Sequence, residues 1–356
     1  YNSYYGSLTG LNGSLYYTGL NSNDTVELWR YTPDQAENNG WTRLNCDENI
    51  FPSANNSCTW NGRLVIYTEG PQGAGIGIYD PDTDTWSSFT TDLITELASP
   101  ALINRGSEIL LVGGQKTEND KNIAQTAIIR VDMESQTTEK TGDLITARVS
   151  PAVAYTADNS VYVAAGTAAD GSMVDGLEKI ENGQSAKVRE NILPQGLAQS
   201  QDYTGAFGTI DGGMILSGPV VTDPDSGQVT ADTYTLNFDT GGFEPTGKIV
   251  NTARVFGGVG TAYRNAFYVL GETNYAENNR VFSVDRSVKT LPQPGEEREK
   301  PIDPVNPVNP VTPDSPSAGG NASTGFVGGN AGILLAAILL AACTAGLLLY
   351  RKRNLG

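Results

Sequence analysis

Histidine, a residue that often takes part in catalysis and metal binding, is absent from all 356 positions of the chain. Serine–histidine–aspartate triads, histidine-ligated zinc or copper sites and histidine general bases are therefore excluded within the chain. No other set of residues forms a recognisable catalytic motif. The sequence thus predicts neither an enzyme nor a bound cofactor, and it directs attention to the cysteines, the acidic turns and a few arginines.

Two of the three cysteines, Cys46 and Cys58, are close together in the N-terminal part of the chain, whereas Cys343 lies in an apolar segment near the C-terminus. In an exported protein a disulfide between Cys46 and Cys58 would persist. Two buried thiols are the alternative, because spacing alone does not establish the geometry that a disulfide requires. Both interpretations are kept.

Alternating carboxylates at Asp80, Asp82 and Asp84 resemble part of a calcium-binding loop. The stretch lacks the glycine and the distant glutamate of an EF-hand loop. We therefore interpret it as a solvated turn between two outer strands and expect no metal site.

The chain is strongly acidic, with a formal net charge of −17. Nucleic-acid binding requires lysine and arginine to neutralise phosphates, so a nucleic-acid partner is not expected. Such a charge is typical of a soluble, exposed surface.

A turn followed by an apolar run recurs along residues 1–291, and this repeat predicts the elements that must position any site. The first copies are Asn12-Gly13 before Leu15-Tyr16-Tyr17 and Asn61-Gly62 before Leu64-Val65-Ile66-Tyr67. The pattern occurs six times at intervals of 44 to 53 residues, with second turn residues at Gly13, Gly62, Gly106, Asn159, Gly212 and Asn265. A period near fifty in an all-β pattern predicts a six-bladed β-propeller with four strands in each blade.

Finer features of the repeats resemble kelch repeats. One unit has the double glycine Gly113-Gly114 after its apolar run, and another has Tyr79-Asp80-Pro81 leading to Trp86. The resemblance implies an arginine ahead of the first strand of a unit, and Arg148 and Arg254 occupy that position. Either arginine could face the central channel, as an epimerase-like activity on sugars would require, or could serve the structure of the blade.

The composition changes after residue 291. Residues 292–325 are rich in proline and glycine, which favours an extended linker of polyproline II type. Residues 326–350 then form an apolar span, of which Ala331 to Tyr350 contains no charged residue, and a helix of that length would cross the roughly 30 Å core of a bilayer. The basic residues of the tail, 351–356, predict a cytoplasmic end and place the repeats outside the cell.

The segment just before the apolar span resembles the tripartite cell-wall sorting signal of sortase substrates. It contains Thr324-Gly325, followed by the apolar span and the basic tail. The resemblance implies cleavage between Thr324 and Gly325 by a sortase and transfer of the protein to a cell wall. A retained transmembrane helix is the alternative.

These features together predict a propeller displayed at the cell surface that binds an extracellular glycan or protein. A carbohydrate-active enzyme of kelch type, similar to an epimerase, is one alternative. A structural spacer within a larger surface protein is the other.

Overall fold

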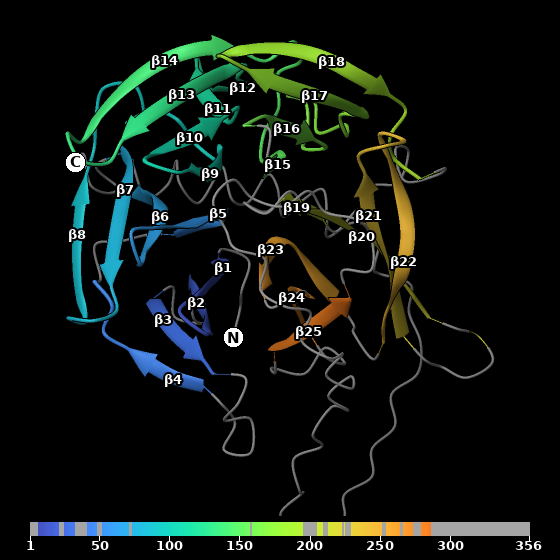
Figure 1. Cartoon of the computed structure of the whole chain (residues 1–356), viewed down its shortest axis with the longest axis horizontal. Helices are drawn as coiled ribbons and strands as arrows, with labels where there is room; N and C mark the ends of the chain where they lie inside the picture. Colours follow the sequence, from blue (N-terminus) through green and yellow to red (C-terminus); the bar gives the residue numbers. More distant parts are fainter. Residues whose placement is uncertain are drawn as a thin grey trace, which may run out of the picture. The chain divides into compact units, whose positions relative to one another are not determined.

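In the computed structural model, every regular element of the described residues is a β-strand (Figure 1). The structure describes residues 6–20, 25–32, 41–47, 52–70, 73–156, 159–194, 205–208, 213–222, 224, 229–250, 254–263, 266–272 and 279–285. The predicted all-β class is therefore confirmed for this part of the chain.

The strands form successive antiparallel sheets of four, each contributed by one repeat. The first blade comprises β1 (Gly6–Leu11), β2 (Ser14–Leu20), β3 (Val26–Tyr31) and β4 (Trp41–Leu44). The second comprises β5 (Pro52–Trp60), β6 (Arg63–Gly70), β7 (Gly73–Asp80) and β8 (Thr85–Phe89). The third comprises β9 (Ala101–Arg105), β10 (Glu108–Val112), β13 (Ala127–Asp132) and β14 (Thr137–Asp143).

The next two repeats have the same strand order. The fourth blade comprises β15 (Ala152–Tyr155), β16 (Val161–Ala164), β17 (Gly176–Glu181) and β18 (Gln184–Glu190). The fifth comprises β19 (Gly205–Gly208), β20 (Met214–Thr222), β21 (Val229–Asn237) and β22 (Gly242–Val250). A two-stranded hairpin, β11 (Gln115–Glu118) and β12 (Lys121–Ala124), is inserted into the third repeat.

The sixth repeat differs from the prediction. It contributes a three-stranded sheet, β23 (Arg254–Tyr263), β24 (Ala266–Glu272) and β25 (Asn279–Asp285), to the described part of the chain. Five complete blades are thus observed rather than the six predicted, because a fourth strand for the last repeat would have to come from outside the described residues.

The sheets are arranged in a propeller-like succession around a centre, with the first strand of each repeat innermost (Figure 1). Neighbouring innermost strands contact one another from β1 through β5, β9, β15 and β19 to β23, and β23 also contacts β1. Side chains reinforce two of these contacts. The hydroxyls of Thr9 and Ser57 are hydrogen-bonded, and the Asn104 amide donates to the carbonyl of Thr59.

Left-handed turn residues connect the first two strands of a repeat. Asn12 and Gly13 have φ of 48° and 79°, and Asn61 and Gly62 have 48° and 71°. Positive φ at both central residues is what a tight hairpin of right-handed twist requires, and Asn-Gly supplies it at little steric cost. The predicted turns at the first four anchors are confirmed, whereas those at Gly212 and Asn265 lie outside the described residues.

In the second, third and fourth blades, the apolar second strand packs against both neighbouring blades. In β10, Ile109 and Leu111 join a buried cluster shared with the second blade, whereas Leu110 and Val112 join one shared with the fourth. Side chains alternate across a strand, so a run that is apolar at every position serves two interfaces at once. The core of the protein is consequently distributed between the blades.

The predicted extended linker (292–325), apolar span (326–350) and basic tail (351–356) all lie outside the described residues. In the part of the chain that is described, no helix has the length and apolar character needed to cross a membrane.

Candidate functional site

Arg148 follows β14 and leads into the fourth blade, and its side chain is only 1% exposed. Its guanidinium donates to the carbonyls of Ala165 and Gly176 at 3.0 and 2.9 Å and pairs with the Glu178 carboxylate at 2.9 Å. Arg148 therefore does not present a charge to an open channel. Its partners are structural groups of the fourth blade, which favours the second of the two predicted roles.

Glu178, the partner in β17, is equally buried and accepts further hydrogen bonds. The backbone N–H groups of Ile145 and Thr146 donate to it at 2.8 and 3.1 Å, and the Ser185 hydroxyl donates at 2.6 Å. Burial alone would raise the pKa of Glu178, but the hydrogen bonds from Ser185 and Ile145 and the charge of Arg148 outweigh it and lower that pKa. Glu178 is therefore ionised and holds the linker between two blades.

The backbone of Arg148 adds two hydrogen bonds to this junction between the third and fourth blades, which is called the joint below. Its N–H donates to Gln125 at 3.2 Å and its carbonyl accepts from Gly114 at 2.8 Å, and these residues flank the β11–β12 hairpin. One residue thus links the hairpin of the third blade to the strands of the fourth. The other predicted arginine, Arg254, begins β23, and its side chain is outside the described residues.

Of the two alternatives for Cys46 and Cys58, the disulfide is not present in the structure. Cys58 is buried in the cluster shared by the second and third blades, whereas Cys46 packs against the cluster shared by the first and second. The two thiols lie in different interfaces, which is the physical reason that they do not pair. Burial also raises the pKa of the Cys58 thiol, so this group is protonated and unreactive.

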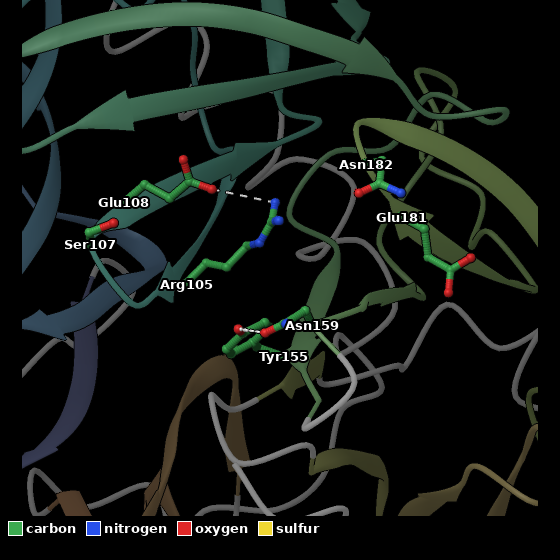
Figure 2. A pocket seen from close by; sticks show the side chains of 7 residues that line it. All are labelled: Arg105, Ser107, Glu108, Tyr155, Asn159, Glu181 and Asn182. Carbon is green, nitrogen blue, oxygen red and sulfur yellow. Dashed lines mark hydrogen bonds and ion pairs between the residues drawn. The ribbon is translucent and has the colours of Figure 1, made fainter. Parts of the chain in front are cut away.

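A polar pocket of about 480 Å³ lies between the third and fourth blades (Figure 2). Its walls are formed at the ends of strands and in the turns that follow them. The lining side chains therefore come from segments that are far apart in the sequence. The lining residues are Arg105, Ser107, Glu108, Tyr155, Asn159, Glu181 and Asn182.

The third blade contributes a charged wall. Arg105 ends β9 and Glu108 begins β10, and their side chains approach to 3.4 Å (Figure 2). Arg130 in β13 lies 3.7 Å from the other oxygen of Glu108 and 2.6 Å from Glu139. Glu108 is thus placed between two guanidinium groups, with its charge balanced locally.

The fourth blade contributes an amide and a second carboxylate. The Tyr155 hydroxyl donates to Oδ1 of Asn159 at 2.5 Å, which orients the amide (Figure 2). Glu181, the last residue of β17, accepts from the Ser160 hydroxyl at 3.3 Å and pairs with Lys179 at 2.5 Å. Asn159 and Asn182 both have positive φ, 63° and 49°, a conformation that asparagine tolerates better than most residues.

The pocket offers hydrogen-bond donors and acceptors. Guanidinium and amide N–H groups can donate, and the two carboxylates can accept. No cluster of three or more metal-ligating side chains is present among the described residues. The arrangement is therefore suited to holding a hydrophilic ligand.

Comparison with known proteins supports the architecture. No protein-family model matches the sequence, and no curated protein matches it. The solved structure of YjhT is similar, with a TM-score of 0.56 and 14% sequence identity, over 79% of this chain and 93% of YjhT. At this identity the likeness concerns the fold alone, and it agrees with the propeller-like arrangement of the blades.

Sequence reasoning did not identify the pocket. The repeat predicted turns at Gly106 and Asn159, but it did not single out Arg105, Glu108 or Glu181. The available signal was the repeat itself, because equivalent turns of adjacent blades meet on the same face of a propeller. Which turns leave a cavity depends on side-chain packing between blades, which the repeat does not specify.

Proposed function

We propose that this protein is a non-enzymatic binding module of kelch type, displayed at the cell surface, whose ligand is an extracellular glycan or protein. The observation that carries the proposal is the polar pocket between the third and fourth blades. Its volume of about 480 Å³ is within the usual range for small-molecule sites. A polymer would insert one segment there and leave the rest outside.

The charged groups of the pocket favour binding over catalysis. A general acid or base must lie within hydrogen-bond reach of the proton that it transfers. Here Glu108 pairs with Arg105 and Arg130, and Glu181 pairs with Lys179, so both carboxylates already have cationic partners. Arg148, which an epimerase-like activity would have required in a channel, is occupied by Glu178.

The binding proposal is tested with the whole chain in detergent micelles, applied to a glycan array and to extracts of surface proteins. Saturable capture of a glycan or of a defined protein is expected. Capture of neither would overturn the proposal and favour the structural-spacer alternative. Turnover in a panel of sugars would instead favour the enzyme alternative.

Surface display is proposed from the composition of the C-terminal part. The linker 292–325 would separate the propeller from an anchor at 326–350, with Thr324-Gly325 as a sortase cleavage site. Mass spectrometry of the C-terminus from isolated envelopes tests the anchor. A chain ending at Thr324 indicates sortase processing, and one that retains Arg353 indicates a membrane helix. Recovery of the protein only from the cytosolic fraction would contradict display.

A further inference from the structure

The pocket between the third and fourth blades holds charged groups in balanced sets. Glu108 lies between Arg105 and Arg130 at 3.4 and 3.7 Å, and Glu181 pairs with Lys179 at 2.5 Å. The lining holds one guanidinium, that of Arg105, and the two carboxylates, which Arg130 and Lys179 contact from outside the lining. An anionic ligand would have to approach both carboxylates, and a cationic ligand would have to compete with their cationic partners. The charged side chains of the lining are therefore already paired, and the site does not favour an anion.

Uncharged hydroxyl groups match the same set of side chains. A hydroxyl can accept from the guanidinium of Arg105 and donate to the carboxylate of Glu108 or Glu181. Hydrogen bonds to charged groups are stronger than those between neutral groups. A carboxylate has about four lone-pair positions, so it can accept several hydrogen bonds at once.

On the wall of the pocket opposite Arg105 and Glu108, the orientation of the Asn159 amide is fixed in the absence of a ligand. Tyr155 is 9% exposed and donates to Oδ1 of Asn159, so the NH₂ end of the amide is turned away from the tyrosine (Figure 2). Preorganisation of this kind lowers the conformational cost of binding. The amide adds directed donors on the side opposite Arg105 and Glu108.

The net charge of the whole chain also disfavours an anionic ligand. A net charge of −17 repels polyanions at long range, and this repulsion weakens as salt is added. Neutral polymers are not affected by it.

We propose that the pocket formed by Arg105, Glu108, Asn159 and Glu181 binds a segment of an uncharged, hydroxyl-rich glycan. This inference rests on the proposed binding function and specifies its site and the chemical class of its ligand. Glu181 serves as an acceptor for ligand hydroxyls, and Arg105 serves as a donor.

The matched variants Glu181→Gln and Glu190→Gln test the site. The two glutamates end adjacent strands of one blade, pair with Lys179 and Lys187 at 2.5 and 2.6 Å, and are similarly exposed, at 59% and 64%. Only Glu181 lines the pocket. Because both side chains are exposed, both variants are expected to fold, which thermal unfolding verifies.

Binding is measured with the whole chain in micelles against glucan, mannan, galactan and chitin oligosaccharides, with uronic-acid oligosaccharides as the anionic counterparts. We expect binding to a neutral oligosaccharide that weakens by about tenfold in Glu181→Gln, the loss of one hydrogen bond to a charged group, and does not change in Glu190→Gln. Preference for the uronic-acid series, or equal affinity of the two variants, would overturn the inference.

The outcomes also separate this inference from the broader proposal. Capture of a protein, or of a glycan whose affinity does not depend on Glu181, would leave the binding function standing and refute the site. Absence of binding to any glycan or surface protein would refute both.

Discussion

At the scale of single residues, Arg148 and Glu178 form a fully buried ion pair. Both side chains are 1% exposed, and their hydrogen bonds join the linker after the third blade to the strands of the fourth. A buried pair of this kind adds little relative to an apolar replacement of both partners, but removal of one partner leaves an uncompensated charge. The joint is therefore sensitive to single substitutions.

Replacement of Glu178 by glutamine is expected to lower the free energy of unfolding by about 3–5 kcal/mol, because Arg148 would remain buried without a counter-charge. The matched control Glu190→Gln removes an exposed ion pair, which is screened by solvent, and should leave the stability nearly unchanged. Denaturant unfolding of both variants measures the difference. Equal stability of the two variants would show that the buried pair does not hold the joint.

The same pair predicts a dependence of stability on pH. The pKa of Glu178 is lower in the folded protein than its ordinary value of 4.5. Its contribution is therefore fully present above about pH 4.5 and is lost as the pH falls through the lowered pKa of the folded state. The difference in unfolding free energy between the wild type and Glu178→Gln should be constant near neutrality and decrease in acid. A difference that grows in acid would contradict the assignment of Glu178 as an ionised group.

At the scale of elements, much of the fold could be predicted from the sequence. The turns Asn12-Gly13 and Asn61-Gly62 predict hairpins, because the positive φ that a tight hairpin requires depends only on the two turn residues. The apolar runs predict strands that pack on both faces, because successive side chains alternate across a strand. The packing of β10 confirms this prediction. The pocket could not be predicted in this way, because Arg105 and Glu181 become neighbours only when two blades pack together.

Gly62 and Gly113 have similar positive φ but different surroundings. Alanine substitutions at the two positions therefore distinguish backbone strain from steric collision. Gly62 has φ of 71° and open space around the position of a Cβ atom, whereas at Gly113, with φ of 68°, a Cβ atom would collide with the carbonyl of Arg148. Gly62→Ala should therefore cost about 1–2 kcal/mol from the left-handed backbone alone.

Gly113→Ala should cost more than Gly62→Ala, because the backbone at the Arg148 joint would also have to shift. Thermal unfolding of the two variants gives the comparison. A smaller loss for Gly113→Ala would mean that the joint is loosely packed.

At the scale of the whole molecule, the repeats place equivalent turns of successive blades on a common face. The pocket between the third and fourth blades lies where such turns meet, and its polar lining is the feature from which binding is proposed. The β11–β12 hairpin connects the other ends of β10 and β13, so it is separated from the pocket by the length of the strands.

Hydrogen–deuterium exchange of the whole chain, with and without the neutral oligosaccharides named above, tests whether the pocket between the third and fourth blades binds them. We expect these ligands to slow amide exchange at the residues that line the pocket, in the segments 105–108 and 181–182 and around Tyr155 and Asn159. Slowed exchange confined to other segments, such as the β11–β12 hairpin, or no change at saturating oligosaccharide, would contradict this expectation.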